Sequence, residues 1–241
     1  MIVKKSYNYS NEVFLVDLNE NILNTKYQVN LRNLIKFEII SLYGRIFLNR
    51  KPKTQNKDKN LLNLGCGSSK FEGWTNADYF KIFRPTNRKR TKPDWMLDIR
   101  FPMNCKDNTW DGVFTEHTLE HLYPIQALNL LKELHRTMKP GAWLRITVPD
   151  LRKYMSYYNS EKVDEKFSKW QTGCEAIRAL TQDWGHVSVW DNELLENFLI
   201  KTGFVNINEV SFAQGSDKTL LKDKEERTWE TLYMEAQKPQ N

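Results

Sequence analysis

The sequence predicts an α/β protein, in which a doubly wound, mostly parallel sheet is preceded by an N-terminal helical arm. From residue 61 onward, short apolar runs alternate with segments of helical periodicity, the pattern of a parallel sheet with crossover helices. The 241 residues suit one large domain with extras, and 40% hydrophobic residues can fill its core. The distribution of charge distinguishes the arm from the rest of the chain. Residues 1–60 carry 11 Lys/Arg and 5 Asp/Glu, so the net charge of +6 resides there.

The composition excludes several classes of protein. No apolar run approaches the roughly 18 residues that a membrane span needs, and no signal segment is evident at the start. The three cysteines are few, odd in number and far apart, which argues against a disulfide framework. We therefore expect a reduced, cytoplasmic protein without a transmembrane span.

Residues 1–60 are predicted to form a basic helical extension and linker. A short strand-like run stands at 13–16, apolar side chains recur at helical spacing over 28–48, and a lysine-rich linker covers 51–60. The helix is expected to pack on the main domain through its apolar stripe. Attachment to an anionic membrane is the less favoured alternative, because the apolar residues are not confined to one face.

Residues 61–241 are predicted to form the main domain. Its strands are expected at 61–64, 76–78, 95–98, 110–115, 142–148, 204–210 and 229–237. Helices are expected from Pro124 to about residue 138, within 150–180, and from an Asp191 N-cap to Gly203. A basic insert, 81–92, precedes the third strand, and its simplest interpretation is a solvated loop.

Polar residues stand where successive strands end. They are Gly65 and Gly67, Asp78, Asp98, Glu116 and His117, and Pro149 and Asp150. Ligands of such sheets bind beyond the carboxyl ends of the strands. A Gly-x-Gly turn lets a ligand approach the backbone closely. Asp78 is placed to accept hydrogen bonds from two ribose hydroxyls, and Asp98 from the exocyclic amine of an adenine.

Four segments, 61–67, 73–78, 116–122 and 134–141, resemble class I S-adenosylmethionine-dependent methyltransferases. The similarity extends to 237 and is greatest to the small type 11 branch often found beside cell-surface polysaccharide genes. The resemblance implies an enzyme with a Rossmann-like, seven-stranded sheet, an antiparallel last strand, and S-adenosyl-L-methionine as cofactor.

The resemblance also implies which residues hold this cofactor. The glycine turn would contact its methionine part, Asp78 its ribose, and Asp98 with Ile99 its adenine, while Glu116 and His117 would lie beside the sulfonium. The full predicted set is Asn63, Gly65, Cys66, Gly67, Asp78, Tyr79, Asp98, Ile99, Glu116 and His117.

Two positions depart from the family pattern. Asn63 stands where an acid is common, so it would accept from the cofactor's ammonium without a charge, and Ser69 replaces the third glycine. Only about eleven residues separate Gly67 from Asp78, against roughly twenty in a dinucleotide fold. This spacing argues against a nicotinamide enzyme and predicts that the intervening helix is reduced to about one turn.

The run from His117 to His121, with Glu120 between them, matches a pattern of zinc peptidases. Here the pattern starts at a strand end, Pro124 follows closely, and no clear third ligand is evident. We therefore expect no metal site, and stoichiometric zinc in the protein would overturn this expectation.

Three residues are predicted to act in catalysis: His186, His117 and Asp150. His186 lies between Trp184 and Trp190, whose rings would stack on a sugar while the imidazole takes a hydroxyl proton. An equally weighted alternative makes both tryptophans core anchors and bonds His186 to backbone. His117 could contact the cofactor or act as a general base. Asp150 could orient a base or cap the helix that follows it.

The sequence thus predicts a methyltransferase acting at oxygen on a saccharide or another small molecule. One alternative is a nucleic-acid (RNA) methyltransferase that uses insert 81–92; it is disfavoured because no Asn-Pro-Pro-aromatic pattern follows the fourth strand. The other is a non-catalytic cofactor-binding or membrane-peripheral module. The acceptor and the oligomeric state stay open.

Overall fold

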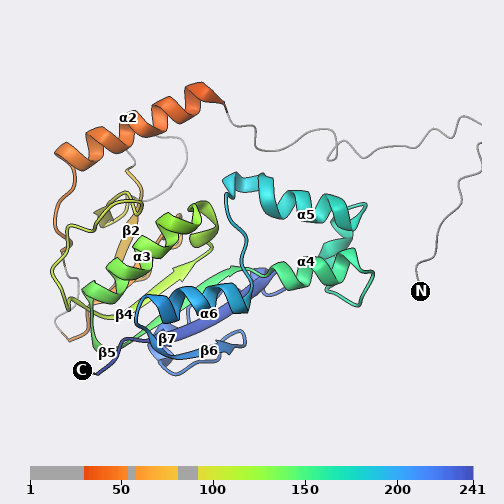
Figure 1. Ribbon diagram of the computed structural model, residues 1–241. Helices are drawn as coiled ribbons and strands as arrows, with labels where there is room; N and C mark the ends of the chain where they lie inside the picture. Colours follow the sequence, from red (N-terminus) through yellow and green to blue (C-terminus); the bar gives the residue numbers. More distant parts are fainter. Residues whose placement is uncertain (1–29, 54–57, 81–91, 241) are drawn as a thin grey trace, which may run out of the picture.

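The structure is a computed structural model that describes residues 30–53, 58–80 and 92–240 (Figure 1). The predicted strand at 13–16 and residues 81–91 of the basic insert lie outside these residues. None of the helices in the described ranges is long and apolar enough to cross a membrane.

Seven strands form one sheet in the order β3-β2-β1-β4-β5-β7-β6. Their bounds are β1 Leu61–Leu64, β2 Thr75–Asp78, β3 Trp95–Met96, β4 Trp110–Glu116, β5 Met138–Pro149, β6 Val205–Val210 and β7 Thr231–Gln237. Strands β1 to β5 pair in parallel, and β7 runs antiparallel to both of its neighbours. The predicted sheet and its antiparallel last strand are confirmed. β5 begins four residues earlier than predicted because it continues directly from the preceding helix.

Within the described residues, five α-helices accompany the sheet. They are α2 Leu31–Phe47, α3 Pro124–Thr137, α4 Leu151–Tyr158, α5 Gly173–Gln182 and α6 Asn192–Lys201. Short 3-10 turns also occur: η1 Leu119–His121, η2 Glu165–Lys169, η3 Asp183–Gly185, η4 Lys218–Leu220 and η5 Glu225–Arg227. The predicted cap of α6 is confirmed, since the Asp191 side chain accepts from the Leu194 amide at 2.8 Å.

Helices α3 and α6 cover one face of the sheet (Figure 1). Leu131 and Leu134 of α3 and Leu195 and Leu199 of α6 are fully buried in the main core beneath them. Burying each such leucine stabilises the fold by roughly 1.5–3 kcal/mol relative to an exposed position. This face supplies the rigid support on which the strand ends are held.

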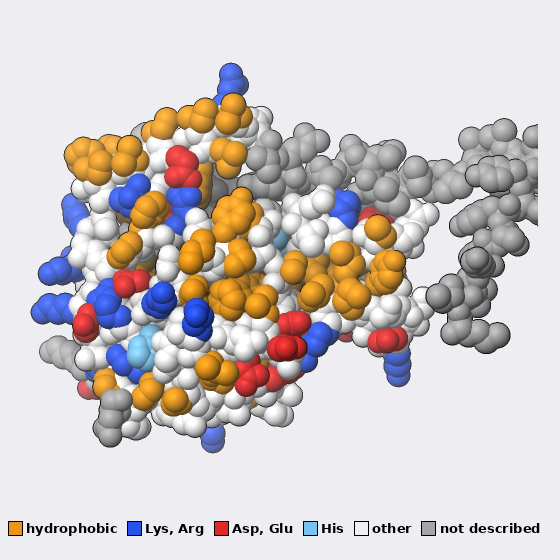
Figure 2. Space-filling model, in the orientation of Figure 1, with side chains coloured by type: hydrophobic (Ala, Val, Ile, Leu, Met, Phe, Trp, Pro, Cys, Tyr) orange, Lys and Arg blue, Asp and Glu red, His pale blue; other side chains and the backbone are white. Residues whose placement is uncertain are grey.

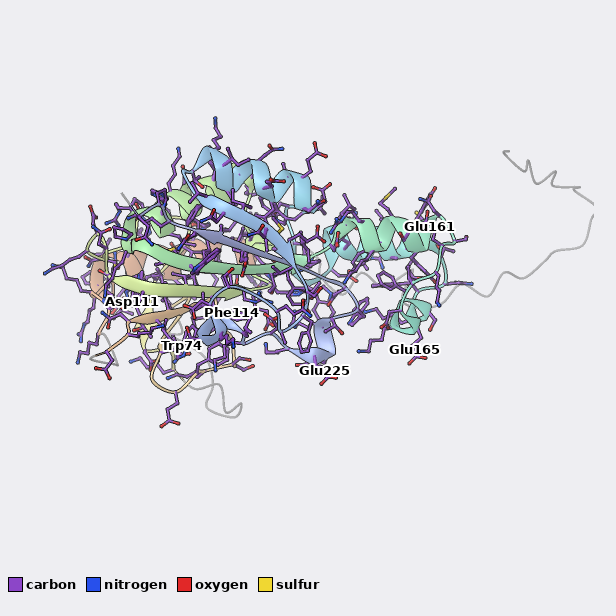
Figure 3. All side chains as sticks on the ribbon, turned by 90° about the horizontal axis from the view of Figure 1, so that it is seen from below. Trp74, Asp111, Phe114, Glu161, Glu165 and Glu225 are labelled. Atoms are coloured by element: carbon purple, nitrogen blue, oxygen red, sulfur yellow. The ribbon has the colours of Figure 1, made fainter. Side chains whose placement is uncertain are left out.

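The opposite face is covered by loops and 3-10 turns within the described residues (Figure 3). Trp74, Phe114 and Leu220 form a second, smaller core there. The β1–β2 connection contains only turns, which confirms the predicted loss of its helix. Arg145 of β5 and Asp223, whose side chains are 2% and 1% exposed, form an ion pair that fastens the covering loop to the sheet.

Helix α2 packs through its small polar side, so the expectation of an apolar contact is wrong. Ser41 and Gly44 are its buried residues, and a Cβ on Gly44 would lie 2.3 Å from the Phe80 ring. Only small side chains allow so close an approach. Hydrophobic side chains line the outer side of this helix (Figure 2). Its exposed large apolar residues are Leu31, Leu34, Ile35, Phe37, Ile39, Leu42, Tyr43, Ile46 and Phe47. Phe37, at 39% the least exposed of these nine, also stacks on the Tyr79 ring.

Candidate active site

The predicted strand-end residues meet at one edge of the sheet. Residue pairing sets the end of β1 beside β2 and β4, with Leu64 opposite both Ala77 and Thr115. β4 and β5 end together, because Glu116 pairs with Thr147. Parallel strands in this register bring their carboxyl ends to a common edge, where the following loops form a site.

The glycine turn after β1 is built as a ligand cradle. Gly65 and Gly67 have positive φ angles of 72° and 56°, a conformation that favours glycine. The amides of Gly65 and Cys66 both donate to the Ala77 carbonyl, at 2.9 and 3.0 Å. A Cβ at Gly67 would meet only the Gly65 carbonyl oxygen, 4.0 Å away, so space for a ligand adjoins the backbone there.

Asn63 ties this turn to β2. Its side-chain amide donates to the Ser69 carbonyl at 2.8 Å and to the Asn76 side chain at 3.0 Å. A carboxylate could make neither bond, because it has no proton to donate. The asparagine therefore has a structural reason to stand where the family pattern has an acid.

Asp78 ends β2 half-buried, and its carboxylate accepts the Tyr79 amide at 2.7 Å. Tyr79 joins this strand end to α2: its hydroxyl donates to the Phe37 carbonyl at 2.6 Å, and its ring stacks on the Phe37 ring with centroids 4.4 Å apart. Burial, followed by the nearby Asp98 charge, raises the pKa of Tyr79 above its ordinary value. Tyr79 thus remains a neutral hydrogen-bond donor.

Asp98 is buried and already bonded to two residues. Ser41 of α2 donates to it at 2.6 Å, and Arg100 donates through Nη2 at 2.7 Å while also pairing with Glu38. Burial alone would raise the pKa of Asp98, but the bonds from Arg100 and Ser41 hold it below its ordinary value. Five hydrogen bonds from Arg100 and Ser41 already reach this carboxylate, which offers about four lone pairs, so a contact with adenine would have to share or replace one of them. Neighbouring Ile99 is half-buried against the main core.

Sequence reasoning missed Ser41, Glu38 and Arg100 around Asp98. The available signal was Ser41 and Gly44, two small residues at helical spacing in an otherwise apolar helix, which mark a close helix contact. It did not identify the surface contacted, because that surface is distant in the sequence.

Glu116 and His117 are held at the end of β4 by the segment that precedes β7. The Glu116 carboxylate accepts from the backbone amide and the ammonium of Lys224. His117 has a positive φ of 48°, with Nε2 at 2.9 Å from the Thr231 hydroxyl and Nδ1 at 3.4 Å from Glu120. The sequence contained no local signal for Lys224 or Thr231.

Glu120, His121 and His186 form a group that we call the histidine cluster. One potential ligand atom of each residue lies within 4.8 Å of the others. Burial lowers the pKa of His186, although the Glu120 charge opposes this shift. The flanking tryptophans differ: Trp190 is a core anchor at 1% exposure, whereas Trp184 is 65% exposed. The alternative that makes both tryptophans core anchors thus holds for Trp190 and fails for Trp184. The backbone bond that it gives His186 is present, with Nδ1 2.7 Å from the Leu180 carbonyl oxygen.

Asp150 is buried after β5 and caps α4. Its carboxylate accepts the Arg152 amide at 3.0 Å and two guanidinium bonds from the same arginine. Arg152 also pairs with Glu209 of β6. The predicted capping role is thus present in the structure.

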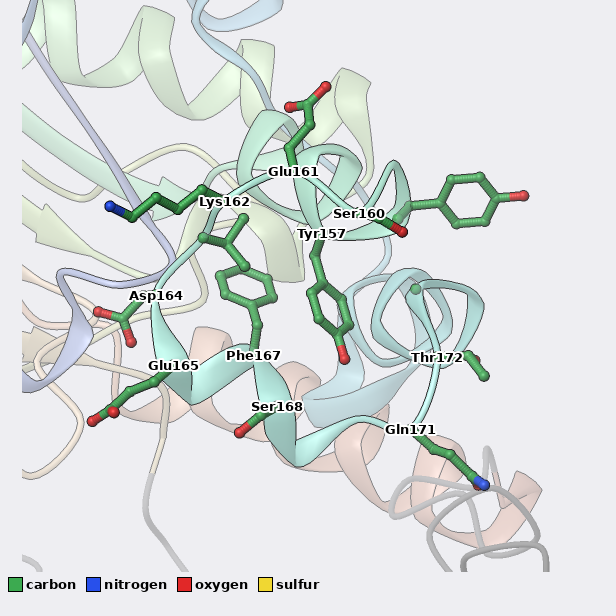
Figure 4. A pocket seen from close by; sticks show the side chains of 13 residues that line it. Tyr157, Ser160, Glu161, Lys162, Asp164, Glu165, Phe167, Ser168, Gln171 and Thr172 are labelled. Carbon is green, nitrogen blue, oxygen red and sulfur yellow. The ribbon is translucent and has the colours of Figure 1, made fainter. Parts of the chain in front are cut away.

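Two pockets flank α4. The first, of about 580 Å³, lies between the end of α4, η2 and the start of α5, where Tyr157, Lys162 and Phe167 contribute to its wall (Figure 4). The second, of about 570 Å³, includes Asp150 and Trp229. The glycine turn and His117 belong to neither of these two pockets.

Comparison with known proteins gives one family. A family model described as a methyltransferase domain matches residues 38–209. No curated protein sequence matches the chain.

Similar solved structures include methyltransferases dependent on S-adenosylmethionine from three organisms. The Archaeoglobus fulgidus protein is 17% identical, with 87% of this chain and 100% of that chain covered and a TM-score of 0.47. The Thermotoga maritima protein is 16% identical, with 86% and 97% covered and a TM-score of 0.46. The Aquifex aeolicus protein is 14% identical, with 88% and 100% covered and a TM-score of 0.44.

Proposed function

The chain belongs to the class I S-adenosylmethionine-dependent methyltransferases, and from this premise we propose that it methylates an oxygen of a saccharide or another small molecule. The protein is thus an enzyme with S-adenosylmethionine as its cofactor, and the alternative of a non-catalytic module is set aside. The observation that carries the proposal is the common edge at which the glycine turn, Asp78 and His117 follow neighbouring strands.

The cofactor is proposed to lie along this edge. The turn from Gly65 through Cys66 to Gly67, with Asn63 behind it, would hold the methionine part. Asp78 and Tyr79 would hold the ribose, and Asp98 with Ile99 the adenine. Glu116 and His117 would border the sulfonium, from which the bound cofactor supplies an electrophilic methyl group. The positive φ angles of the two glycines and the open space at Gly67 support this assignment.

Three residues are proposed to prepare the acceptor. His186 contributes to removing the hydroxyl proton, His117 orients the reacting groups, and Asp150 holds the α4 side of the acceptor site. His186 is supported by its place within the histidine cluster beside η1, where its Nε2 lies 4.0 Å from Glu120 Oε1. Trp184, largely exposed next to it, offers a ring on which a sugar can stack.

We expect labelled methyl from S-adenosylmethionine to appear in a saccharide or small hydroxyl compound when the protein is screened against a glycan and metabolite library. His186→Ala is expected to lower that turnover at least tenfold, the lower range for a lost proton-transfer group, with cofactor affinity unchanged. His135→Ala is the matched control, since His135 packs on Phe204 away from the site. Label found only in RNA would contradict the proposed acceptor class.

A second role is favoured by the outward face of α2. We propose that α2, within a proposed extension of residues 1–60, attaches the catalytic domain of residues 61–241 to an anionic membrane surface. Its nine exposed apolar residues are accompanied by exposed cations at Arg32, Lys36, Arg50, Lys51 and Lys53. The acid of this helix, Glu38, is paired with Arg100. Apolar contact plus positive charge is the combination that binds anionic lipid.

The full chain is expected to cosediment with phosphatidylglycerol-containing vesicles at low ionic strength and much less with pure phosphatidylcholine vesicles. The double variant Ile39→Asp/Ile46→Asp should lose this binding because both side chains are more than 60% exposed on α2. Ile200→Asp places the same charge at a 57% exposed site on α6 and should bind like the wild type. Equal sedimentation of both variants would refute attachment through α2.

A further inference from the structure

The histidine cluster has the composition of a metal site. Glu120 and His121 come from η1, whereas His186 follows η3 in a distant part of the sequence. One ligand atom of each lies within 4.8 Å of the others. Two imidazoles and one carboxylate form a ligand set that zinc uses in catalytic sites, with further positions left for water or a substrate.

Both imidazoles are oriented as metal-binding histidines usually are. Nδ1 of His186 lies 2.7 Å from the Leu180 carbonyl oxygen, and Nδ1 of His121 lies 3.3 Å from the Gly185 carbonyl oxygen. A carbonyl can only accept, so each Nδ1 carries the proton and each Nε2 keeps an electron pair. A backbone carbonyl on the other ring nitrogen is the usual outer support of a metal-bound histidine.

Glu120 is a buried carboxylate, 1% exposed, that faces three histidines. Neither oxygen has a well-aligned hydrogen bond among the described residues, although the His117 imidazole lies near enough to stabilise the charge. The nearby nitrogens are His117 Nδ1 at 3.4 Å and His186 Nε2 at 4.0 Å from Oε1. Burying a carboxylate is costly unless a charge or donors compensate it, and a divalent cation would do so.

The backbone holds the two ligand segments together. The amides of Val187 and Ser188 both donate to the Glu120 carbonyl, at 2.8 and 3.2 Å, so the loop carrying His186 is fastened to η1. His121 is exposed while Glu120 is buried, so the cluster extends from the protein surface to the buried carboxylate. The backbone therefore holds the three side chains near one another before any ion binds.

We propose that Glu120, His121 and His186 bind one zinc ion. Tetrahedral ligands about 2.0–2.2 Å from zinc lie roughly 3.3–3.6 Å apart, so the three atoms, which lie within 4.8 Å of one another, would have to move together by up to about 1.5 Å when the ion binds. If the proposed function is also right, the ion would bind the acceptor oxygen and lower the pKa of its hydroxyl; His186 would then help to remove the proton as a zinc ligand and not as a free base. Zinc binding itself does not depend on that function. The competing partner for Glu120 is a protonated His117.

The test is calorimetric titration of the full chain with zinc sulfate after EDTA treatment and dialysis, without cofactor or acceptor. The wild type is expected to bind one ion per chain. His121→Ala and His186→Ala should each weaken binding at least a hundredfold, since even outer-shell changes cost 10- to 100-fold. His135→Ala removes a histidine outside the cluster and should bind zinc like the wild type. Magnesium chloride should give no comparable binding, because imidazole ligands do not suit it.

Glu120→Gln distinguishes zinc from a protonated His117 as the partner of the buried carboxylate. It keeps the shape of the side chain, and it should weaken zinc binding if Glu120 is a ligand. Unchanged zinc affinity in this variant would assign Glu120 to His117 and overturn the proposal. Absence of stoichiometric zinc binding by the wild type, or wild-type zinc affinity in both histidine variants, would overturn it too. A negative result in this titration would not contradict the proposed methyl transfer, because neither cofactor nor acceptor is present in the experiment.

Discussion

Asp78→Ala is expected to weaken binding of S-adenosylmethionine at least a hundredfold, to the point of undetectable binding in calorimetry. The proposed role of Asp78 is to accept both ribose hydroxyls, and hydrogen bonds to a charged group contribute roughly 1.5–3 kcal/mol each. The half-buried position of Asp78 at the end of β2 makes the carboxylate available to a ligand while shielding it from part of the solvent. Titration of the full chain with S-adenosylmethionine or S-adenosylhomocysteine measures the effect.

Asp107→Ala is the control for this experiment, because Asp107 is a largely exposed acid that pairs with Arg136. Its cofactor affinity should equal that of the wild type. The circular dichroism spectrum of Asp78→Ala should also match the wild type, because Asp78 is the last residue of β2 and its carboxylate accepts from the adjacent Tyr79 amide. Retained affinity in a folded Asp78→Ala protein would remove Asp78 from the cofactor site.

Arg145→Met is expected to lower the free energy of unfolding by about 3–5 kcal/mol, the usual result of removing one member of a buried ion pair. Asp223 would remain buried at 1% exposure without its cation. The Gln214 carbonyl would also lose the donor that lies 2.8 Å away. The loop over the second face would then lose its main attachment to β5. Urea unfolding at neutral pH measures the change from the midpoint and slope.

Two further variants identify the cause of that loss. Lys139→Met breaks an ion pair with Asp111 in which the lysine side chain is 40% exposed, and it should cost no more than about 1 kcal/mol. The double variant Arg145→Met/Asp223→Leu removes both buried charges and should recover much of the lost stability. If Arg145→Met costs no more than Lys139→Met, the buried pair does not hold the loop.

The positions and the type of the parallel strands followed from local patterns in the sequence. Apolar runs such as 61–64 and 110–115 are buried wherever a parallel sheet carries them, so their existence and type depend little on the neighbours. The starts of helices were predictable for the same reason. Asp191 caps α6 by accepting one of its amides, and Pro124 begins α3 because proline lacks the amide that would be left without a partner there. The short β1–β2 connection followed from the small number of residues between Gly67 and Asp78.

The environment of Asp98 could not be predicted, because it depends on a helix distant in the sequence. The apolar periodicity indicated that α2 would bury its row of apolar side chains. In the structure Ser41, on the other side of this helix, donates a hydrogen bond to the buried Asp98 carboxylate. A hydrogen bond to a buried charge and a close approach at Gly44 decide the orientation. A pattern of apolar residues along the sequence predicts neither this hydrogen bond nor this close packing.

The sequence by itself determined the sheet, the glycine turn and the acids that follow its strands, because spacing along one chain suffices for these. The tertiary structure alone decided which side of α2 faces the protein and which histidine stands beside Glu120. From the motif at 117–121 a metal site was not expected, since no third ligand was evident. Folding brings His186 to Glu120 through backbone bonds between two distant segments, and only those long-range bonds create the cluster.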